Sequence, residues 1–150
     1  MKFNKSKKII INTIFYGLMS IFIFISLIMI KAKINGTQPS ILGNKFFIVL
    51  TGSMSPTIDV GDMVIVKDVK PEAVNVNDVI TFGSNSSDNV TTHRVKEVLS
   101  NNENLSYITQ GDANNVEDPT PVEEDFLVGR VNKVIPKVGK IILWVKGLFK

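Results

Sequence analysis

The hydrophobic and polar positions divide the chain into stretches of different character. From Ile9 to Ile30 the chain runs for 22 residues without a charge. At about 1.5 Å per residue, a helix of this length measures roughly 33 Å, and a bilayer hydrocarbon core is about 30 Å thick. A buried core helix is the alternative, but the sequence offers no second helix of comparable length to cover it. The pattern therefore predicts a transmembrane helix at residues 9–30.

A cleavable signal peptide is the other alternative for this segment. Its apolar region would be about 7–15 residues long and would precede a cleavage site with small residues. Here the apolar run is longer, and Ala32 stands between Lys31 and Lys33. We therefore expect an uncleaved anchor. Four lysines precede it and two follow it, so the positive-inside bias places residues 1–8 in the cytoplasm and residues 31–133 outside.

Short runs rich in β-branched and aromatic residues follow the helix and alternate with turn signals. Each run has the length and composition of a β-strand, and helical periodicity is lacking between them. The six runs are KFFIVLTG, DMVIVKDV, DVITFG, TTHRVKEVL, LSYITQG and FLVGRVNKVI. The sequence therefore predicts a mainly β fold, an antiparallel β-domain at residues 31–133 of roughly 100 residues.

The C-terminal stretch, residues 134–150, mixes apolar residues with spaced lysines. Its longest charge-free apolar run, Ile141 to Val145, is too short to span a bilayer. Trp144 among lysines is typical of an amphipathic helix that lies in the membrane interface. We expect a short C-terminal amphipathic helix here, with a short second span or a helix packed on the domain as alternatives.

The charges are segregated along the chain. The net charge is +3, but all fourteen acidic residues lie between Asp59 and Asp125, a stretch with four basic residues and a net charge of −10. A nucleic-acid-binding module usually carries a basic surface, so we expect no nucleic-acid partner. The basic ends suit an anionic lipid bilayer. Cysteine is absent, which excludes disulfides and thiolate metal sites.

The most informative polar segment is LTGSMSPTI, Leu50 to Ile58, which follows an apolar strand. Serine becomes a nucleophile when a base takes its proton and hydrogen-bond donors stabilise the oxyanion. We expect Gly52 to permit a tight turn and Pro56 to stiffen its exit, so that Ser53 stands clear of the strand. The Ser53 backbone N–H and the Thr51 hydroxyl would form an oxyanion hole. Taken alone, such a segment is more often a turn that closes a strand.

His93 is the single histidine of the chain, in the segment TTHRV. A lone histidine is usually a polar surface residue. However, a neutral imidazole is the commonest general base near pH 7. Strand alternation places His93 on the same face as Val95 and opposite Lys96, so the lysine is not an easy substitute as the base.

The segment QGDANNVEDP, residues 110–119, has the composition of a solvated loop. A nucleophile–base pair needs a third group to orient the imidazole, and both Asp112 and Asp118 are placed to supply it. A metal site is the alternative for these carboxylates. The loop lacks the alternating oxygen-ligand spacing of a calcium site, so we expect neither a metal nor another cofactor.

In this order, the segments resemble those of the type I signal peptidases. The similar boxes are TGSMSPT for the nucleophile, GDMV and NDVI for the strand-leading repeats, THRV for the general base, and GDANN for the late Gly-Asp box. Most bacterial members carry lysine at the base position. His93 there is similar to the endoplasmic-reticulum-type branch of eukaryotes, archaea and some Gram-positive bacteria. In that branch one of two acidic residues six positions apart is thought to complete the site, and Asp112 and Asp118 have this spacing.

The resemblance implies a membrane-bound serine endopeptidase that removes N-terminal signal peptides from exported proteins through an acyl-enzyme. Ser53 would be the nucleophile, His93 the base, Asp112 or Asp118 the third residue, and Ser53 with Thr51 the oxyanion hole. The implied partners are signal-peptide-bearing precursors and the lipid bilayer, and the location allows an association with the export machinery. The implied localisation is the cell membrane, with a single span and an extracytoplasmic catalytic domain.

Two other functions are alternatives for a chain of this pattern. A self-cleaving repressor-type peptidase normally has a lysine base, a DNA-binding helical domain and no spanning helix, and the sequence differs on each point. A catalytically inactive, membrane-tethered binding or scaffold protein of the same fold is the second alternative. The presence of Ser53, His93 and the paired aspartates argues against it, because a scaffold does not need this set.

Overall fold

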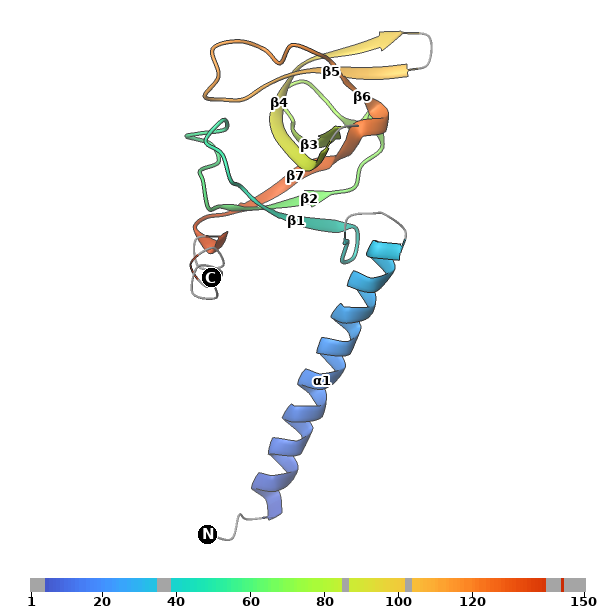
Figure 1. Cartoon of the computed structure of the whole chain (residues 1–150), viewed down its shortest axis with the longest axis vertical. Helices are drawn as coiled ribbons and strands as arrows, with labels where there is room; N and C mark the ends of the chain where they lie inside the picture. Colours follow the sequence, from blue (N-terminus) through green and yellow to red (C-terminus); the bar gives the residue numbers. More distant parts are fainter. Residues whose placement is uncertain (1–4, 35–38, 85–86, 102–103, 140–143, 145–150) are drawn as a thin grey trace. The chain divides into compact units, whose positions relative to one another are not determined.

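The first of two compact units, Met1–Leu42, contains one long helix. The computed structural model describes residues 5–34, 39–84, 87–101, 104–139 and 144 of the chain. Helix α1 spans Lys5–Ile34, so the predicted span at 9–30 lies inside it (Figure 1). Among the described residues it is the one helix long and apolar enough to cross a membrane.

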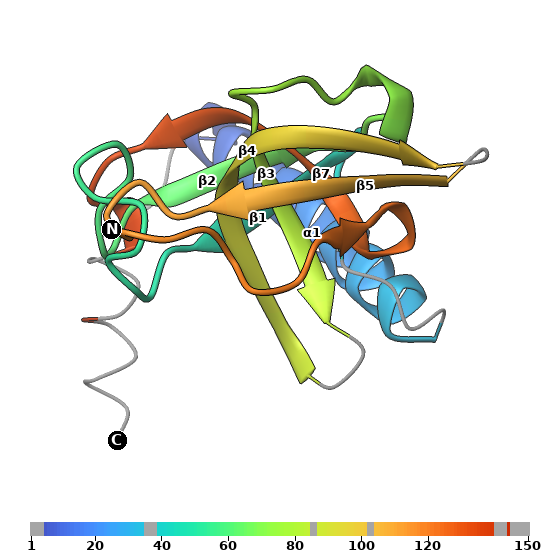
Figure 2. The same ribbon diagram turned by 90° about the horizontal axis from the view of Figure 1, so that it is seen from above.

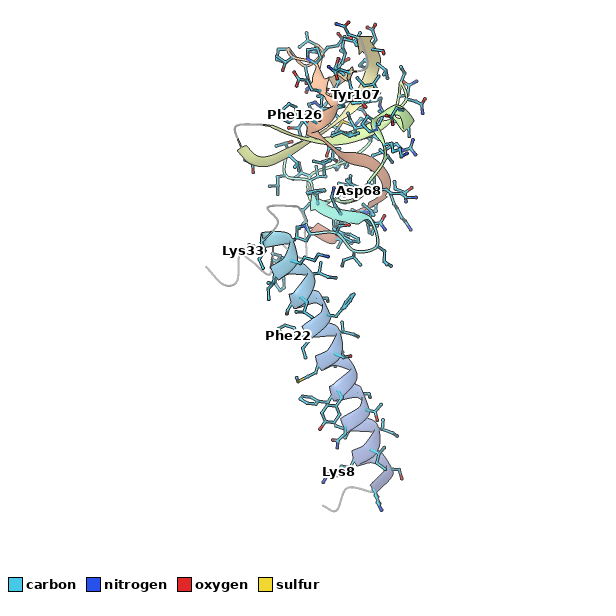
Figure 3. The ribbon with its side chains drawn as sticks, turned by 90° about the vertical axis from the view of Figure 1, so that its right-hand side faces the viewer. Lys8, Phe22, Lys33, Asp68, Tyr107 and Phe126 are labelled. Carbon is cyan, nitrogen blue, oxygen red and sulfur yellow. The ribbon has the colours of Figure 1, made fainter. Side chains whose placement is uncertain are left out.

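The side chains of α1 explain why it suits a bilayer. Lys8 and Lys33 lie towards its two ends, with Phe22 between them (Figure 3). Phe22 is 71% exposed, and large apolar residues are exposed along the whole helix. A helix that is apolar on every side is stable when an apolar solvent or another protein surrounds it. The helix therefore has the length and the surface of a membrane span.

The second unit, Gly43–Lys150, is built on one curled antiparallel sheet (Figures 1 and 2). In its described part the sheet has seven strands in the order β1-β2-β7-β3-β4-β5-β6. The strands are β1 (Asn44–Ile48), β2 (Met63–Lys67), β3 (Val79–Ser84), β4 (Ser87–Asn101), β5 (Asn104–Gln110), β6 (Val122–Glu123) and β7 (Leu127–Ile135). Two short 3₁₀ helices, η1 (Pro71–Ala73) and η2 (Glu124–Phe126), lie in the connections.

Two apolar clusters form the core of the sheet. Side chains alternate between the two faces of a strand, so residues two apart are buried together. The first cluster joins β3, β4, β5 and β6 and consists of Val74, Ile80, Val95, Tyr107 and Val122. The second joins β2 to the loop after β1 and consists of Met54, Ile58, Val64 and Val66. Burying an apolar side chain of this size contributes roughly 1.5–3 kcal/mol, so both clusters hold the strands in register.

The predicted mainly β fold is confirmed, and the six predicted strands correspond to β1–β5 and β7. The two-residue strand β6 was missed because it is too short to show alternation. Strand β7 continues to Ile135, into the stretch expected to begin the C-terminal segment. The predicted C-terminal amphipathic helix falls mostly on residues 140–143 and 145–150, which lie outside the described residues.

Candidate active site

Ser53 lies in the loop between β1 and β2. Backbone hydrogen bonds between Val49 and the Gly61–Asp62 turn close the base of this loop, at 2.9 Å each. Inside it, Met54 and Ile58 point into the second apolar cluster and are 2% and 1% exposed. Because buried residues follow Ser53 closely, the serine is held in place while its own side chain is only partly covered.

His93 lies on β4, two residues before Val95 of the first apolar cluster. It pairs with Ile80 of β3 and shares the inward face with Val95, as strand alternation predicted. The residue is 7% exposed. Its Nε2 atom lies 3.1 Å from Ser53 Oγ. The sheet therefore brings the predicted nucleophile and base into hydrogen-bond contact.

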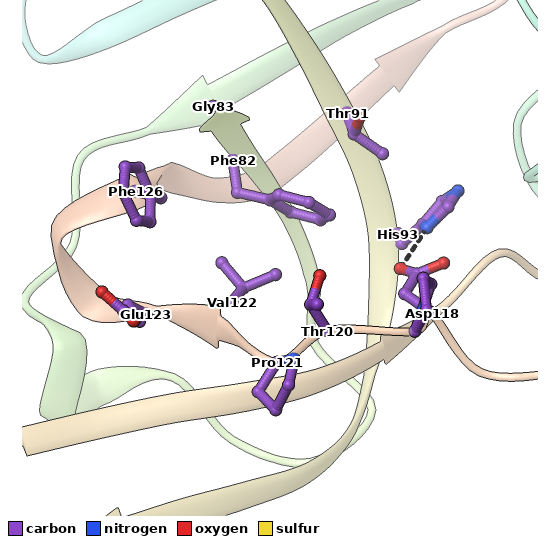
Figure 4. A pocket seen from close by; sticks show the side chains of 11 residues that line it. Phe82, Gly83, Thr91, His93, Asp118, Thr120, Pro121, Val122, Glu123 and Phe126 are labelled. Carbon is purple, nitrogen blue, oxygen red and sulfur yellow. Dashed lines mark hydrogen bonds and ion pairs between the residues drawn. The ribbon is translucent and has the colours of Figure 1, made fainter. Parts of the chain in front are cut away.

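Asp118 lies on the other side of the imidazole, in the loop after β5. Its Oδ2 atom is 2.6 Å from His93 Nδ1, and Figure 4 shows this contact as a dashed line. The sequence left open which aspartate meets the histidine, and the structure places Asp118 there. Thr109, which the sequence analysis did not single out, donates its hydroxyl to the same Oδ2 at 2.6 Å. Thr109 is fully buried on β5.

Asp112 occupies a different position and pairs with Arg94, the neighbour of His93. The guanidinium donates through Nε to Oδ1 at 2.8 Å and through Nη2 to Oδ2 at 2.6 Å. This bidentate pair lowers the pKa of Asp112 below its ordinary value, and a hydrogen bond from Thr57 acts in the same direction. Asp112 is therefore tied both to β4 and to the loop that carries the serine.

The turn at Gly111 also contacts the serine loop. The backbone N–H of Ala113 donates to the Ser53 carbonyl at 2.8 Å. A Cβ atom at Gly111 would lie 2.5 Å from the Ser53 carbonyl oxygen and 3.0 Å from His93 Nε2. Since real Cβ atoms do not approach other atoms so closely, this position requires glycine. The late Gly-Asp box is thus packed directly under the Ser53–His93 contact.

The geometry is that of a nucleophile, a base and an orienting carboxylate. With a proton on Nδ1, the imidazole donates to Asp118 and leaves Nε2 free to accept the proton of Ser53. Thr51 is exposed in the serine loop, and its part in an oxyanion hole stays a prediction. Among the described residues, no three His, Asp or Glu side chains gather in a way that could hold a metal ion.

These observations define a class of protein. It has a Ser-His-Asp site on a curled antiparallel sheet and an apolar N-terminal helix. The chain is similar to "Signal peptidase I W" of Bacillus subtilis (strain 168), with 29% identity over 119 residues. It is also similar to "Signal peptidase complex catalytic subunit SEC11C" of Homo sapiens, with 27% identity over 104 residues. The resemblance to type I signal peptidases is thereby confirmed, including the branch suggested by His93.

The extent of these similarities is limited. The first covers 79% of this chain and 62% of the relative, and the second covers 64% and 54%. The chain thus spans less than two thirds of the length of either relative. No family model matches the sequence. Together with α1, the relatives support a membrane-anchored protein.

Proposed function

We propose that this protein is a membrane-anchored serine endopeptidase that removes N-terminal signal peptides from exported precursors. The observation that carries the proposal is the contact series Ser53 Oγ to His93 Nε2 at 3.1 Å and His93 Nδ1 to Asp118 Oδ2 at 2.6 Å. A serine, a base and an orienting carboxylate in this order can activate the hydroxyl for attack on a carbonyl. The similarity to named signal peptidases supports the substrate class.

The reaction follows from the positions of these atoms. His93 Nε2 takes the Ser53 proton while Oγ attacks the carbonyl carbon of the cleaved bond. The imidazolium then gives this proton to the leaving amine, the C–N bond breaks, and the signal peptide stays on Ser53 as an ester. Water, deprotonated by the same nitrogen, hydrolyses the ester and restores the serine. Asp118 keeps the imidazole in the tautomer that both steps need.

Two further groups support this chemistry. The Ser53 backbone N–H and the Thr51 hydroxyl are proposed to stabilise the oxyanion, where one donor contributes about 100-fold or more to kcat. Asp112 and Arg94 are proposed as positioning residues, because their ion pair holds the Gly111 turn against the Ser53 carbonyl. Neither residue of this ion pair is proposed to touch the reacting atoms.

The anchor and its orientation complete the proposal. The distribution of lysines around α1 supports a cytoplasmic N-terminus and an extracytoplasmic catalytic domain in the cell membrane. A tethered enzyme meets membrane-bound precursors at a high effective concentration, which favours signal peptides over soluble polypeptides. The same location brings the enzyme near the export machinery that delivers these precursors.

Cleavage of a radiolabelled secretory precursor by membranes that contain the full chain tests the proposal. Wild-type membranes should produce the mature form, whereas Ser53→Ala and His93→Ala membranes with equal protein levels should not. Ser100→Ala, at the exposed far end of β4, is the matched serine control and should behave as wild type. Unchanged cleavage by Ser53→Ala, or none by wild type, would contradict the proposal and favour a non-catalytic binding role.

A further inference from the structure

A cavity of about 450 Å³ opens beside the imidazole of His93. His93 and Asp118 belong to its wall, and Ser53 does not. Its inner wall is apolar and is formed by Phe82, Val122 and Phe126 (Figure 4). The function proposed above does not use this space.

The cavity continues the first apolar cluster towards the active site. The Phe82 ring lies edge-on to the imidazole of His93, with 6.2 Å between the ring centroids. Val122 belongs to the buried cluster, and Phe82 and Phe126 pack against it. The cavity is therefore a gap at the end of a packed core. Transfer of an apolar group from water to its preformed apolar wall would be favourable.

The rim of the cavity is polar. Thr91 of β4 and Thr120 of the segment after Asp118 are both exposed at its edge. Glu123 and Asp118 each contribute a carboxylate to the lining, on different sides of the cavity (Figure 4). A buried acidic group would be repelled by these charges and would also lose its hydration. The cavity is thus suited to an uncharged apolar side chain on a polypeptide whose backbone stays at the polar rim.

The position of His93 indicates which part of a polypeptide reaches this cavity. His93 Nε2 must protonate the leaving nitrogen, so the chain after the cleaved bond begins within hydrogen-bond distance of the imidazole. An extended chain advances roughly 3.3–3.6 Å per residue. The first two residues of the leaving segment therefore lie within reach of a wall whose Phe82 ring is 6.2 Å from the imidazole.

We propose that this cavity, here called the imidazole-side pocket, is a specificity site for the mature end of the substrate. It receives an apolar side chain from one of the first two residues after the cleaved bond. Consecutive side chains of an extended segment point to opposite sides, so one of these two positions enters the pocket and the other faces away. The inference rests on the proposed peptidase function. It adds a selection for the residues after the cleaved bond, in the segment that leaves.

The test uses the full chain in detergent micelles and peptides that share one signal-peptide cleavage region. Alanine, leucine or glutamate is placed in turn at the first and second positions after the bond, and kcat/KM is measured for each peptide. At one of the two positions leucine should exceed alanine by about tenfold or more, because even one methylene contributes roughly tenfold in an apolar pocket. Glutamate at that position should be cleaved more slowly than alanine.

Variants of the rim connect this preference to the pocket. Thr91→Trp places a large ring over the pocket, and the leucine-to-alanine ratio should fall to about one. Ser100→Trp, exposed near the other end of β4, is the matched control and should keep the wild-type ratio. Thr120→Trp places a ring over the pocket from the segment after Asp118 and serves as the second variant if Thr91→Trp does not fold.

The outcomes separate this inference from the proposed function. Cleavage of all wild-type peptides with equal efficiency would overturn the pocket and leave the peptidase function intact. A preference for leucine that survives in both rim variants would also overturn the pocket. So would a preference that depends on the residues before the bond and is lost with Thr91→Trp. Failure of the wild type to cleave any of the peptides, while it also fails on a membrane-bound precursor, would instead reject the peptidase function.

Discussion

Thr109 holds Asp118 through two hydrogen bonds, one to its carboxylate and one from its backbone. The Thr109 hydroxyl donates to Asp118 Oδ2 at 2.6 Å, and the Asp118 backbone N–H donates to the Thr109 carbonyl at 2.8 Å. The same Oδ2 faces His93 Nδ1. Since Thr109 is fully buried on β5, the sheet itself fixes the direction from which Asp118 approaches the imidazole.

Replacement of Thr109 by valine should lower kcat with little effect on KM. Valine keeps the shape of threonine but removes the donor, so Asp118 loses one of the bonds that orient it. One such bond contributes roughly 1 kcal/mol, which corresponds to a fall in kcat of about fivefold to tenfold. Thr109→Ser retains the hydroxyl and should recover most of the rate. Equal activity in Thr109→Val and wild type would show that Asp118 does not need this support.

The two aspartates should respond differently to conversion into asparagine. Asp118→Asn removes the acceptor that selects the Nδ1–H tautomer, and in a well-studied triad the corresponding change lowers kcat by about 10⁴-fold. Asp112→Asn breaks the ion pair with Arg94 and should mainly lower the thermal midpoint. Precursor cleavage and thermal unfolding in detergent, measured on both variants, check this division. A larger loss of kcat in Asp112→Asn at full folding would reverse the two roles.

The Asp112–Arg94 pair should make stability depend on pH in the acid range. The hydrogen bonds from Arg94 lower the pKa of Asp112 from 3.8. The carboxylate therefore stays ionised in the folded state at a pH where the same group in the unfolded chain takes up a proton. The stabilisation is complete above about pH 3.8 and is lost as the pH falls through the lower folded value. The difference in thermal midpoint between wild type and Asp112→Asn should therefore be constant near neutrality and shrink below about pH 4. A difference that persists unchanged at pH 2 would contradict this account.

The strands were predictable because each buries one face and repeats its apolar residues at every second position. Val64 and Val66 of β2, and Tyr107 and Thr109 of β5, show this alternation in the sequence and are buried in the structure. The alternation also placed His93 with Val95. Thr109 was not singled out, because a buried threonine in a strand has the same local pattern whether it fills a core or supports a carboxylate.

The choice between Asp112 and Asp118 could not be made from the sequence. Both lie in one irregular loop, and the path of that loop is set by contacts far along the chain, such as the bond from Ala113 to the Ser53 carbonyl. The turn expected at Gly52 is present, since the Ser55 backbone N–H donates to the Gly52 carbonyl at 3.1 Å. However, the φ of Gly52 lies outside the left-handed region and an added Cβ there meets no atom within 4 Å, so the turn does not require glycine. The crowded glycine of the site is Gly111 instead.

Replacement of Gly111 by alanine should reduce activity far more than stability. The added methyl group would lie 2.5 Å from the Ser53 carbonyl oxygen, 2.8 Å from Asn114 Nδ2 and 3.0 Å from His93 Nε2. The Asn114 side chain can move aside, but the Ser53 backbone and the packed imidazole must shift apart. A shift of about 1 Å between reacting groups lowers rates by roughly 100-fold.

Gly52→Ala adds the same methyl group in open space at the residue directly before Ser53, so it is the comparison for Gly111→Ala. It should lose much less activity, because nothing near Ser53 or His93 has to move. Precursor cleavage, read beside the thermal midpoint of each variant in detergent, separates a displaced site from a poorly folded domain. Similar losses of activity in the two variants would mean that any added side chain in these loops disturbs cleavage. The close packing of Gly111 against Ser53 and His93 would then not be the cause.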